Sequence, residues 1–445
     1  MRLGENILKL KEWYIKRGLK FVCLRTAKLI GRYSLAPAKA MRRIDHCIET
    51  LSDRGCAPTF PTPGILVERY PRFVRRLQDE GVEITVHGYQ HVNLNDYPLE
   101  EAKRQLERAV SAFKRLKIEA HGFRGPYLGC CDELIDSLPA GLFSYSSNKA
   151  IRWRHNSDAT SQWSTFFNKV ENFYQAMDSA EMVCVPRNRS NLIEIPICIP
   201  DDLQILDGLG LGVEGLAQTW QQILHQIYQR GELFNLLFHT ELAAQCERPF
   251  VDLLCAARAH RPPVWIARLC EISDWWKEKS GFKVDVHPNS NSLKLDFSCT
   301  PRATILAKGL GSFGSEGIWD GAYYRLQAKT LTLPASPRPF VGLQDNAPER
   351  VVFFLREQGY IVETGGMASS CGTYIDAETL SKLSSEVQII NYIEASPAPL
   401  VRFWRWPNGA KSALSLSGDL DALSLQDYAS RFIPRIKEGP LCITA

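Results

Sequence analysis

The sequence predicts an α/β fold in which parallel strands form a closed or partly closed barrel, with a smaller β-rich domain inserted into it. Three observations favour this fold. Strand and helix patterns alternate up to about residue 281, polar motifs directly follow several strands, and turn-rich alternation begins at about residue 282. Alternating strands and helices indicate a parallel sheet with crossover helices, and chemistry in such barrels gathers at the carboxyl ends of the strands.

The alternating part of the chain supplies the elements of the predicted barrel. Apolar residues at helical spacing predict helices at 37–54, 66–80 and 99–116, and a helix between the last two strands. Short apolar runs bounded by turn residues predict strands at 57–63, 82–86, 121–128, 191–200 and 233–238. Residues 262–279 add one more strand and helix.

The organisation of the whole chain follows from these patterns. We expect residues 1–281 to form most of the barrel and 282–400 to form the β-rich domain, with helices at 348–358 and near 377–385. Residues 401–445 are expected to return to the barrel with a strand at 413–416, an acidic loop and a helix.

Composition excludes several classes of protein. The 445 residues are 45% hydrophobic and 23% charged with a formal net charge of +4, which is ordinary globular composition. There is no basic stripe interleaved with aromatic residues, so nucleic-acid binding is not expected. The 13 cysteines are dispersed without a CxxC pair, which fits a reducing compartment. Because no signal-peptide pattern is found either, we expect a cytoplasmic location.

The N-terminal 33 residues are rich in lysine and arginine. They are consistent with a surface helix packed on its own domain, or with a basic amphipathic helix that contacts an anionic membrane surface. No apolar run approaches the roughly 20 residues needed to span a bilayer.

His87 and His91 are the clearest candidates for chemistry. They follow the predicted strand 82–86 and are four residues apart, so a single turn of chain can present both imidazoles to one divalent ion. The same spacing also arises among ordinary polar loop residues.

Two carboxylates, Asp419 and Asp421, follow the strand 413–416 in the sequence SGDLDA. Two imidazoles and one carboxylate leave open positions on a metal, where bound water becomes a nucleophile near neutral pH. One aspartate could bind the metal while the other takes the proton from water. Alternatively, Asp421 and Ser417 only cap the following helix.

Two more residues suit the same reaction. Arg124, in FRGPY, can orient the base carboxylate through a bidentate contact. His239, at the end of an apolar strand, can act as a general acid that protonates a leaving amine. A histidine there is equally well explained as a core residue with satisfied hydrogen bonds.

The sequences TVHGYQH, GFRGPY and LLFH resemble the second, third and fifth motifs of the polysaccharide deacetylases (the NodB homology, or carbohydrate esterase family 4, group). Their order and spacing are similar over about residues 35–280. The resemblance implies a distorted (β/α) barrel of the polysaccharide deacetylase type and a divalent metal ion, usually zinc, bound by Asp-His-His. The residues that match the motifs would bind metal (His87, His91), orient the base (Arg124), supply the acid (His239) and contact the substrate (Pro126, Tyr127).

The chain departs from the family's pattern at two places. The first motif, an aspartate pair, should precede Pro37, where no acid is found, and 417–425 is similar to that motif. A circular permutation explains this, with Asp419 as the base and Asp421 as the metal ligand unless the roles swap. Alternatively, residues from about 400 open an incomplete second domain and the first domain is inactive. Near 143–148, moreover, serines stand where members often carry an aspartate that tunes the acidic histidine.

The function that the resemblance implies is metal-dependent removal of an acetyl or other acyl group from an N-acetylated sugar or glycan precursor. Two alternatives remain: an inactive module that binds glycans or partners, and a hydrolase of a non-sugar C–N amide bond. Among the ten tryptophans, Trp319, Trp404 and Trp406 are the exposed-loop candidates for stacking on sugar rings, and the alternative for each is a place in the core, where most tryptophans lie.

Overall fold

The computed structural model describes residues 31–154, 173–189, 191–310 and 318–431. The predicted N-terminal helix with its membrane contact therefore lies almost entirely outside the described residues. Contacts divide the chain into two compact units: Met1–Leu138 with Phe238–Glu247 and Gly418–Ala445, and Pro139–Leu237 with Arg248–Ser417. Within the described ranges, no helix is both long and apolar enough to cross a bilayer. The predicted boundaries at 281 and 400 stay a prediction.

The first unit contains parallel strands bordered by helices. Its strands are β1 (Thr59–Thr62), β2 (Glu83–Val86), β3 (Gly122–Phe123) and the end of β22 (Ser412–Asp419). Its helices are α2 (Ala38–Ser52), α3 (Gly64–Arg69), α4 (Pro71–Asp79), α5 (Leu99–Arg115), α6 (Asp132–Asp136), α14 (Leu425–Ser430) and the 3₁₀ turns η1 (Leu94–Asp96), η2 (Pro126–Leu128) and η4 (Thr240–Leu242).

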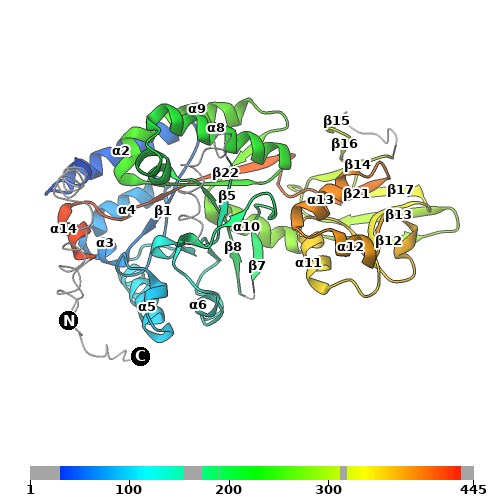
Figure 1. The fold of residues 1–445 in the computed structure, drawn as a ribbon, viewed down its shortest axis with the longest axis horizontal. Helices are drawn as coiled ribbons and strands as arrows, with labels where there is room; N and C mark the ends of the chain where they lie inside the picture. Colours follow the sequence, from blue (N-terminus) through cyan, green and yellow to red (C-terminus); the bar gives the residue numbers. More distant parts are fainter. Residues whose placement is uncertain (1–30, 155–172, 190, 311–317, 432–445) are drawn as a thin grey trace. The chain divides into compact units, whose positions relative to one another are not determined.

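The order of the strands brings distant segments together. β22 lies between β10 (Leu233–His239) and β1, and β1 pairs in parallel with β2, Thr62 standing opposite Val86. Figure 1 shows the red strand β22 beside the blue strand β1. This is the neighbour that a permuted barrel requires for the strand 413–416, although the permutation itself stays a prediction.

Amphipathic helices cover these strands because their apolar residues repeat at helical spacing. In α2 the buried positions include Ala40, Ile44, Cys47 and Leu51, one stripe of the helix. One expectation here was wrong: 66–80 is not a single helix. It is split into α3 and α4 at Tyr70, because Pro71 begins the second helix and disfavours helical backbone at the residue before it.

The second unit contains further strands and helices of the parallel sheet. Its strands are β4 (Tyr145–Ser146), β5 (Ala150–Arg152), β6 (Met177–Asp178), β7 (Arg187–Arg189), β8 (Leu192–Glu194), β9 (Ile197–Ile199), β11 (Val264–Ile266), most of β10 and most of β22. Its helices are η3 (Gln204–Gly208), α8 (Gly212–Arg230), most of α9 (Ala243–Ala259) and α10 (Leu269–Ser280). The predicted strand 191–200 is thus two strands, which pair with different neighbours.

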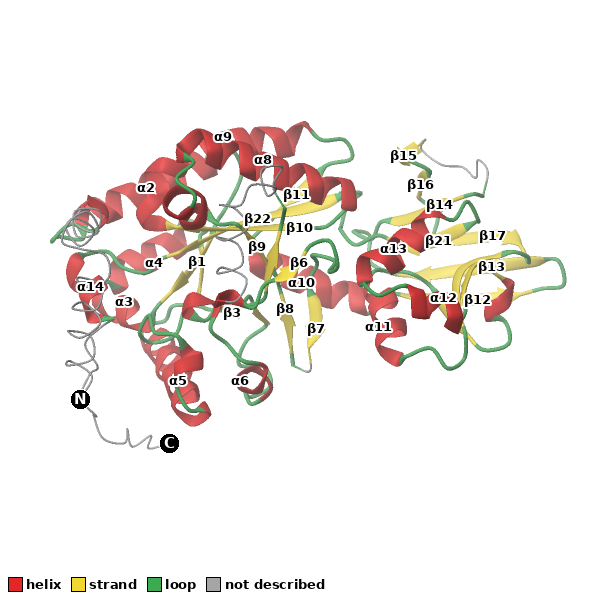
Figure 2. Cartoon of the chain, in the orientation of Figure 1, coloured by secondary structure: helices red, strands yellow, loops and turns green. Residues whose placement is uncertain are grey.

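The rest of the second unit contains three smaller sheets (Figure 2). Two are antiparallel: β12 (Lys283–Pro288), β13 (Ser292–Ser298) and β17 (Thr330–Pro334), and then β15 (Ile318–Asp320), β16 (Tyr323–Leu326), β14 (Ile305–Lys308) and β21 (Leu400–Phe403). The third is parallel, in the order β19 (Val362–Thr364), β18 (Arg338–Leu343), β20 (Cys371–Ile375). The accompanying helices are α11 (Glu349–Glu357), η5 (Ala368–Ser370), α12 (Ala377–Lys382) and α13 (Glu386–Ala395).

The predicted α/β fold class is confirmed: the chain has a largely parallel sheet bordered by helices, and additional β-rich sheets. The expectation that Trp404 and Trp406 lie on exposed loops was wrong. Both are buried, and Trp406 packs against Trp276 with ring centroids 5.8 Å apart. They belong to the core because large aromatic side chains bury more apolar area than most others.

Candidate metal centre

The two predicted histidines lie directly after β2. The His87 backbone N–H donates to the Thr62 carbonyl at 3.1 Å, which continues the pairing of β2 with β1 by one residue. Gly88 then takes a positive φ of 68°, a conformation that glycine adopts without strain, and the chain turns back to place His91 beside His87. The two ring centroids are 5.2 Å apart and both side chains are buried.

One nitrogen of His87 is fixed by the backbone. Nδ1 lies 2.8 Å from the carbonyl oxygen of Arg124, so Nδ1 carries the hydrogen and donates it. This contact leaves Nε2 as the nitrogen with a lone pair, and Nε2 faces the carboxylates. A backbone carbonyl that holds the far nitrogen of an imidazole is the usual support of a metal-binding histidine.

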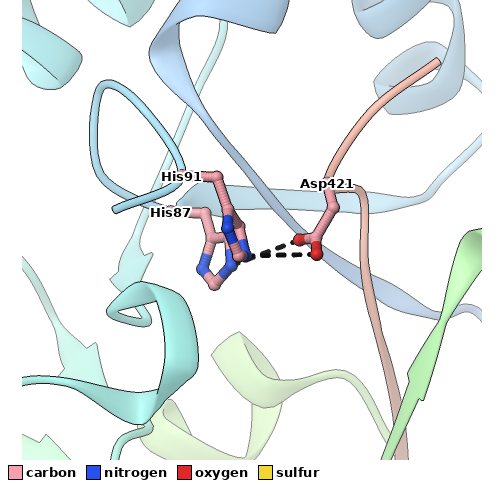
Figure 3. A group of neighbouring side chains, drawn as sticks. All are labelled: His87, His91 and Asp421. Carbon is pink, nitrogen blue, oxygen red and sulfur yellow. Dashed lines mark ion pairs between the residues drawn. The ribbon is translucent and has the colours of Figure 1, made fainter. Parts of the chain in front are cut away.

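The carboxylates come from the end of β22. The Leu420 backbone N–H donates to the Pro61 carbonyl at 2.9 Å, which fixes the chain between Asp419 and Asp421. Asp421 Oδ2 lies 3.1 Å from His91 Nε2, and Asp421 Oδ1 lies 3.5 Å from His87 Nε2. Figure 3 shows both imidazoles directed toward this carboxylate.

These three side chains fit a divalent metal ion. One ligand atom from each of His87, His91 and Asp421 can be chosen so that all lie within 4.8 Å of one another. His87 Nε2 and Asp421 Oδ1 are buried and make no hydrogen bond. Buried polar atoms without a hydrogen-bond partner are rare, and two imidazoles with one carboxylate match the donor set of catalytic zinc sites.

The protonation states suit metal binding. Burial, with the nearby charge of Arg431, lowers the pKa of His91 to about 4. Burial alone would raise the pKa of Asp421, but the nearby charges of His91 and Arg431 lower it well below its usual range. The carboxylate is therefore ionised and the His91 imidazole neutral at neutral pH, the forms in which these side chains bind metal.

Asp419 occupies a second position beside the same histidine. Arg124 Nη1 donates to Asp419 Oδ1 at 2.8 Å, while Asp419 Oδ2 lies 3.7 Å from His87 Nε2. Both side chains of this ion pair are buried. The geometry separates the two aspartates: Asp421 faces both histidines, and Asp419 is held by Arg124 at the edge of the group.

The other predicted residues lie near this group. The Tyr127 ring stands edge-on to His91 at 4.6 Å, and the side chain remains 41% exposed. Pro126 begins the same 3₁₀ turn and is buried. His239 ends β10 and is half-buried, and the next residue, Thr240, donates to the Asp419 carbonyl at 3.2 Å. All of these residues belong to the first unit.

Sequence reasoning missed Arg431, which follows α14. Its Nη2 lies 3.2 Å from Asp421 Oδ2, and its guanidinium stands over the Tyr428 ring at 4.9 Å. Burial opposes the charge, yet Asp421 and Tyr33 raise the pKa of Arg431. The only signal in the sequence was an arginine at the end of a predicted helix, which normally means a solvated charge.

Glu241 was missed as well. It follows His239 by two residues, is buried, and accepts a hydrogen bond from the Tyr33 hydroxyl at 2.6 Å. Burial raises the pKa of Glu241.

The fold and these residues define a class: an α/β protein with a buried His-His-Asp group, of a kind that could hold a metal ion, at the carboxyl ends of parallel strands. The family model described as "Polysaccharide deacetylase" matches residues 40–139, the segment that contains both histidines and Arg124. The resemblance seen in the sequence is confirmed over this segment.

Solved structures of the same group are similar to part of the chain. A protein from Mycobacterium smegmatis assigned as a polysaccharide deacetylase is 18% identical, with a TM-score of 0.41 over 54% of this chain and 77% of that one. Another from Pseudomonas aeruginosa PAO1 is 16% identical, with a TM-score of 0.40 over 53% and 72%. The family 4 carbohydrate esterase from Streptomyces lividans, in complex with acetate, is 14% identical, with a TM-score of 0.28 over 49% and 80%. No curated protein matches the chain.

Proposed function

We propose that the protein is a metal-dependent hydrolase that removes an acetyl group from an N-acetylated sugar or glycan precursor. The observation that carries this proposal is the buried group of His87, His91 and Asp421, with Asp419 held beside it by Arg124. The match of residues 40–139 to the polysaccharide deacetylases supports deacetylation as the reaction.

Each residue has a role that its contacts support. His87, His91 and Asp421 would hold the metal, and zinc suits two nitrogen ligands and one oxygen ligand. The metal supplies Lewis acidity and lowers the pKa of bound water. Asp419 takes a proton from the attacking water, because Arg124 fixes the orientation of its carboxylate.

The leaving amine and the substrate would be served by the remaining predicted residues. His239, at the end of β10, donates a proton to the leaving nitrogen. Tyr127, half exposed against His91, contacts the acyl group, and a backbone N–H near it stabilises the oxyanion. Pro126 holds this turn in place.

Metal content tests the proposal before any substrate is known. Purified wild type is compared with His87→Ala and Asp421→Asn after saturation with zinc and dialysis, and the bound metal is counted by mass spectrometry. We expect about one equivalent in the wild type and none in either variant. Acetate release from N-acetylglucosamine oligosaccharides is then measured on the loaded wild type.

Other outcomes would favour other functions. If the wild type takes up no metal, the result favours a glycan- or partner-binding module without catalytic activity. Metal without acetate release, but with hydrolysis of small amides, indicates a non-sugar C–N substrate.

We also propose that the substrate is met in the cytoplasm. Every cysteine among the described residues is a free thiol, which suits a reducing compartment. Recovery of the native protein from a secreted or periplasmic fraction would overturn this location.

A further inference from the structure

A cavity of about 670 Å³ lies within the second unit, at one end of the small parallel sheet β19-β18-β20. Its walls come from the residues after β18 and β20 and from α11, α12 and α13. Its volume falls within the range of about 300–1,000 Å³ that ligand sites occupy. The function proposed above does not use it.

The topology of this sheet predicts a binding site at that position. The chain forms the central strand β18 first, then β19 on one side and β20 on the other, all parallel. The direction of winding therefore reverses between β18 and β20. Ligands of open α/β sheets bind in the crevice outside the carboxyl ends of the strands at such a switch point. Gln344 and Asp376, the residues that directly follow β18 and β20, both line the cavity.

The walls of the crevice are held in place by hydrogen bonds. Gln344 Oε1 accepts from the Ala377 backbone N–H at 2.8 Å, which links the two strand ends. Asp376 Oδ1 accepts from the Thr379 backbone N–H at 2.7 Å, and a Glu386 carboxylate oxygen accepts from the Val183 backbone N–H at 3.1 Å. A site whose polar groups are already fixed loses little conformational entropy when a ligand binds.

The charges on the walls select the kind of ligand. Three acids line the cavity, Glu181, Asp376 and Glu386, against one basic side chain, Arg350. Glu386 already pairs with Arg187, so Glu181 and Asp376 are the acids left to meet a ligand. Phosphate sites require several donors from arginine, lysine or backbone amides, so this cavity disfavours a phosphorylated ligand. A ligand that carries a positive charge is favoured instead.

The remaining lining suits a sugar. Carboxamides and serine hydroxyls, among them Asn346 and Ser384, both donate and accept hydrogen bonds, as sugar hydroxyls do. The floor is apolar and includes the buried Phe354 and Ile375, against which the C–H face of a sugar ring can pack.

We propose that this cavity binds a saccharide with free amino groups, the product class of a glycan deacetylase. The choice of an amino sugar rests on the function proposed above; the position of the site rests on the sheet alone.

Calorimetry on the full-length His87→Ala chain tests this proposal, because that variant removes the metal site as a competing centre. The probes are the glucosamine trisaccharide, its tri-N-acetyl form and ADP. We expect the glucosamine trisaccharide to bind about tenfold more tightly than the acetylated form, and ADP not to bind. Glu181→Gln, at an exposed residue, should abolish most of this preference, and Leu380→Trp should fill the cavity and abolish binding.

Glu378→Gln is the matched control, since Glu378 is an exposed acid on α12 that does not line the cavity. Circular dichroism and a thermal melt show that each variant is folded. The proposal is overturned if neither saccharide binds, if ADP binds in their place, or if Glu181→Gln and Leu380→Trp both bind like the control.

The two proposals fail separately. Acetate release by the metal-loaded wild type without saccharide binding in His87→Ala overturns only the second site. Binding in His87→Ala without acetate release from the wild type overturns only the deacetylase.

Discussion

Arg124 and Asp419 form a buried ion pair between residues 295 positions apart in the chain, with Nη1 and Oδ1 separated by 2.8 Å. The contact joins the turn after β3 to the end of β22. It also distinguishes the roles of the two aspartates, because Asp419 pairs with Arg124 while Asp421 faces both histidines.

Asp419→Asn should therefore strongly lower activity without removing the metal. The amide keeps the shape of the carboxylate but cannot take a proton, so acetate release should fall by about 10²–10⁴-fold. Metal content, counted by mass spectrometry, should stay at the wild-type level. If Asp419→Asn loses the metal and Asp421→Asn keeps it, the two aspartates have the opposite roles.

Arg431→Gln should raise the affinity for the metal. The substitution removes the positive charge that lies 3.2 Å from Asp421 Oδ2, beside a cation site. Competition with a chelating dye measures the dissociation constant for zinc. Arg69→Gln is a useful comparison, because Arg69 pairs with Asp427 on α14 rather than with Asp421. A fall in affinity specific to Arg431→Gln would mean that the arginine mainly positions the ligand.

Gly418→Ala should destabilise the protein at the base of the site. A Cβ at this position of β22 would lie 2.4 Å from a ring carbon of Phe238, so strand or ring must move. Overpacking of this kind costs about 1–3 kcal/mol of unfolding free energy. Urea unfolding should show this loss, with partial recovery in Gly418→Ala/Phe238→Leu. Gly366→Ala, where a Cβ meets nothing within 4 Å, should differ little from the wild type.

Lys279→Met should stabilise the protein more at pH 6 than at pH 9.5. Burial lowers the pKa of Lys279 to about 7 in the fold. Between pH 7 and about pH 10.4, the usual pKa of lysine, Lys279 is mostly protonated in the unfolded chain and mostly neutral in the folded one. Wild-type stability therefore rises with pH through this window, and below pH 7 the full cost of the buried charge remains.

The advantage of Lys279→Met should be on the order of 2–4 kcal/mol at pH 6 and should shrink as pH rises. Urea unfolding at several pH values measures it. Lys277→Met, at an exposed lysine on the same helix, should show no such dependence. An equal effect of Lys279→Met at both pH values would contradict the lowered pKa.

The grouping of His87, His91 and Asp421 could be expected from the sequence, because each residue follows a strand and the carboxyl ends of parallel strands meet at one edge. The same reasoning could not find Arg431. Its position depends on how α14 packs, with the Leu425 backbone N–H donating to Ser34 and Asp427 held by Arg69 and Tyr70. Contacts of this kind leave no periodic signal in the sequence.

Other differences from expectation have local causes. The predicted helix 66–80 is interrupted at Tyr70. The spacing of apolar residues continues past Pro71, but a continuous helical backbone does not, because proline lacks the N–H and its ring clashes with the preceding turn. Trp404 and Trp406 were candidates for exposed loops that stack on sugar rings. Both indole N–H groups instead donate to backbone carbonyls in the core, Trp404 to Lys411 and Trp406 to Gly231.

The pairing of Arg124 with Asp419 also has a consequence for biosynthesis. A ribosome adds about 5–20 residues per second, so the 295 residues between the partners take roughly 15–60 s to make. During that interval the histidines and Arg124 have been synthesised and neither aspartate has. The candidate site is therefore completed late in translation, and a nascent chain that stops before β22 lacks both of its aspartates, including the carboxylate that pairs with Arg124.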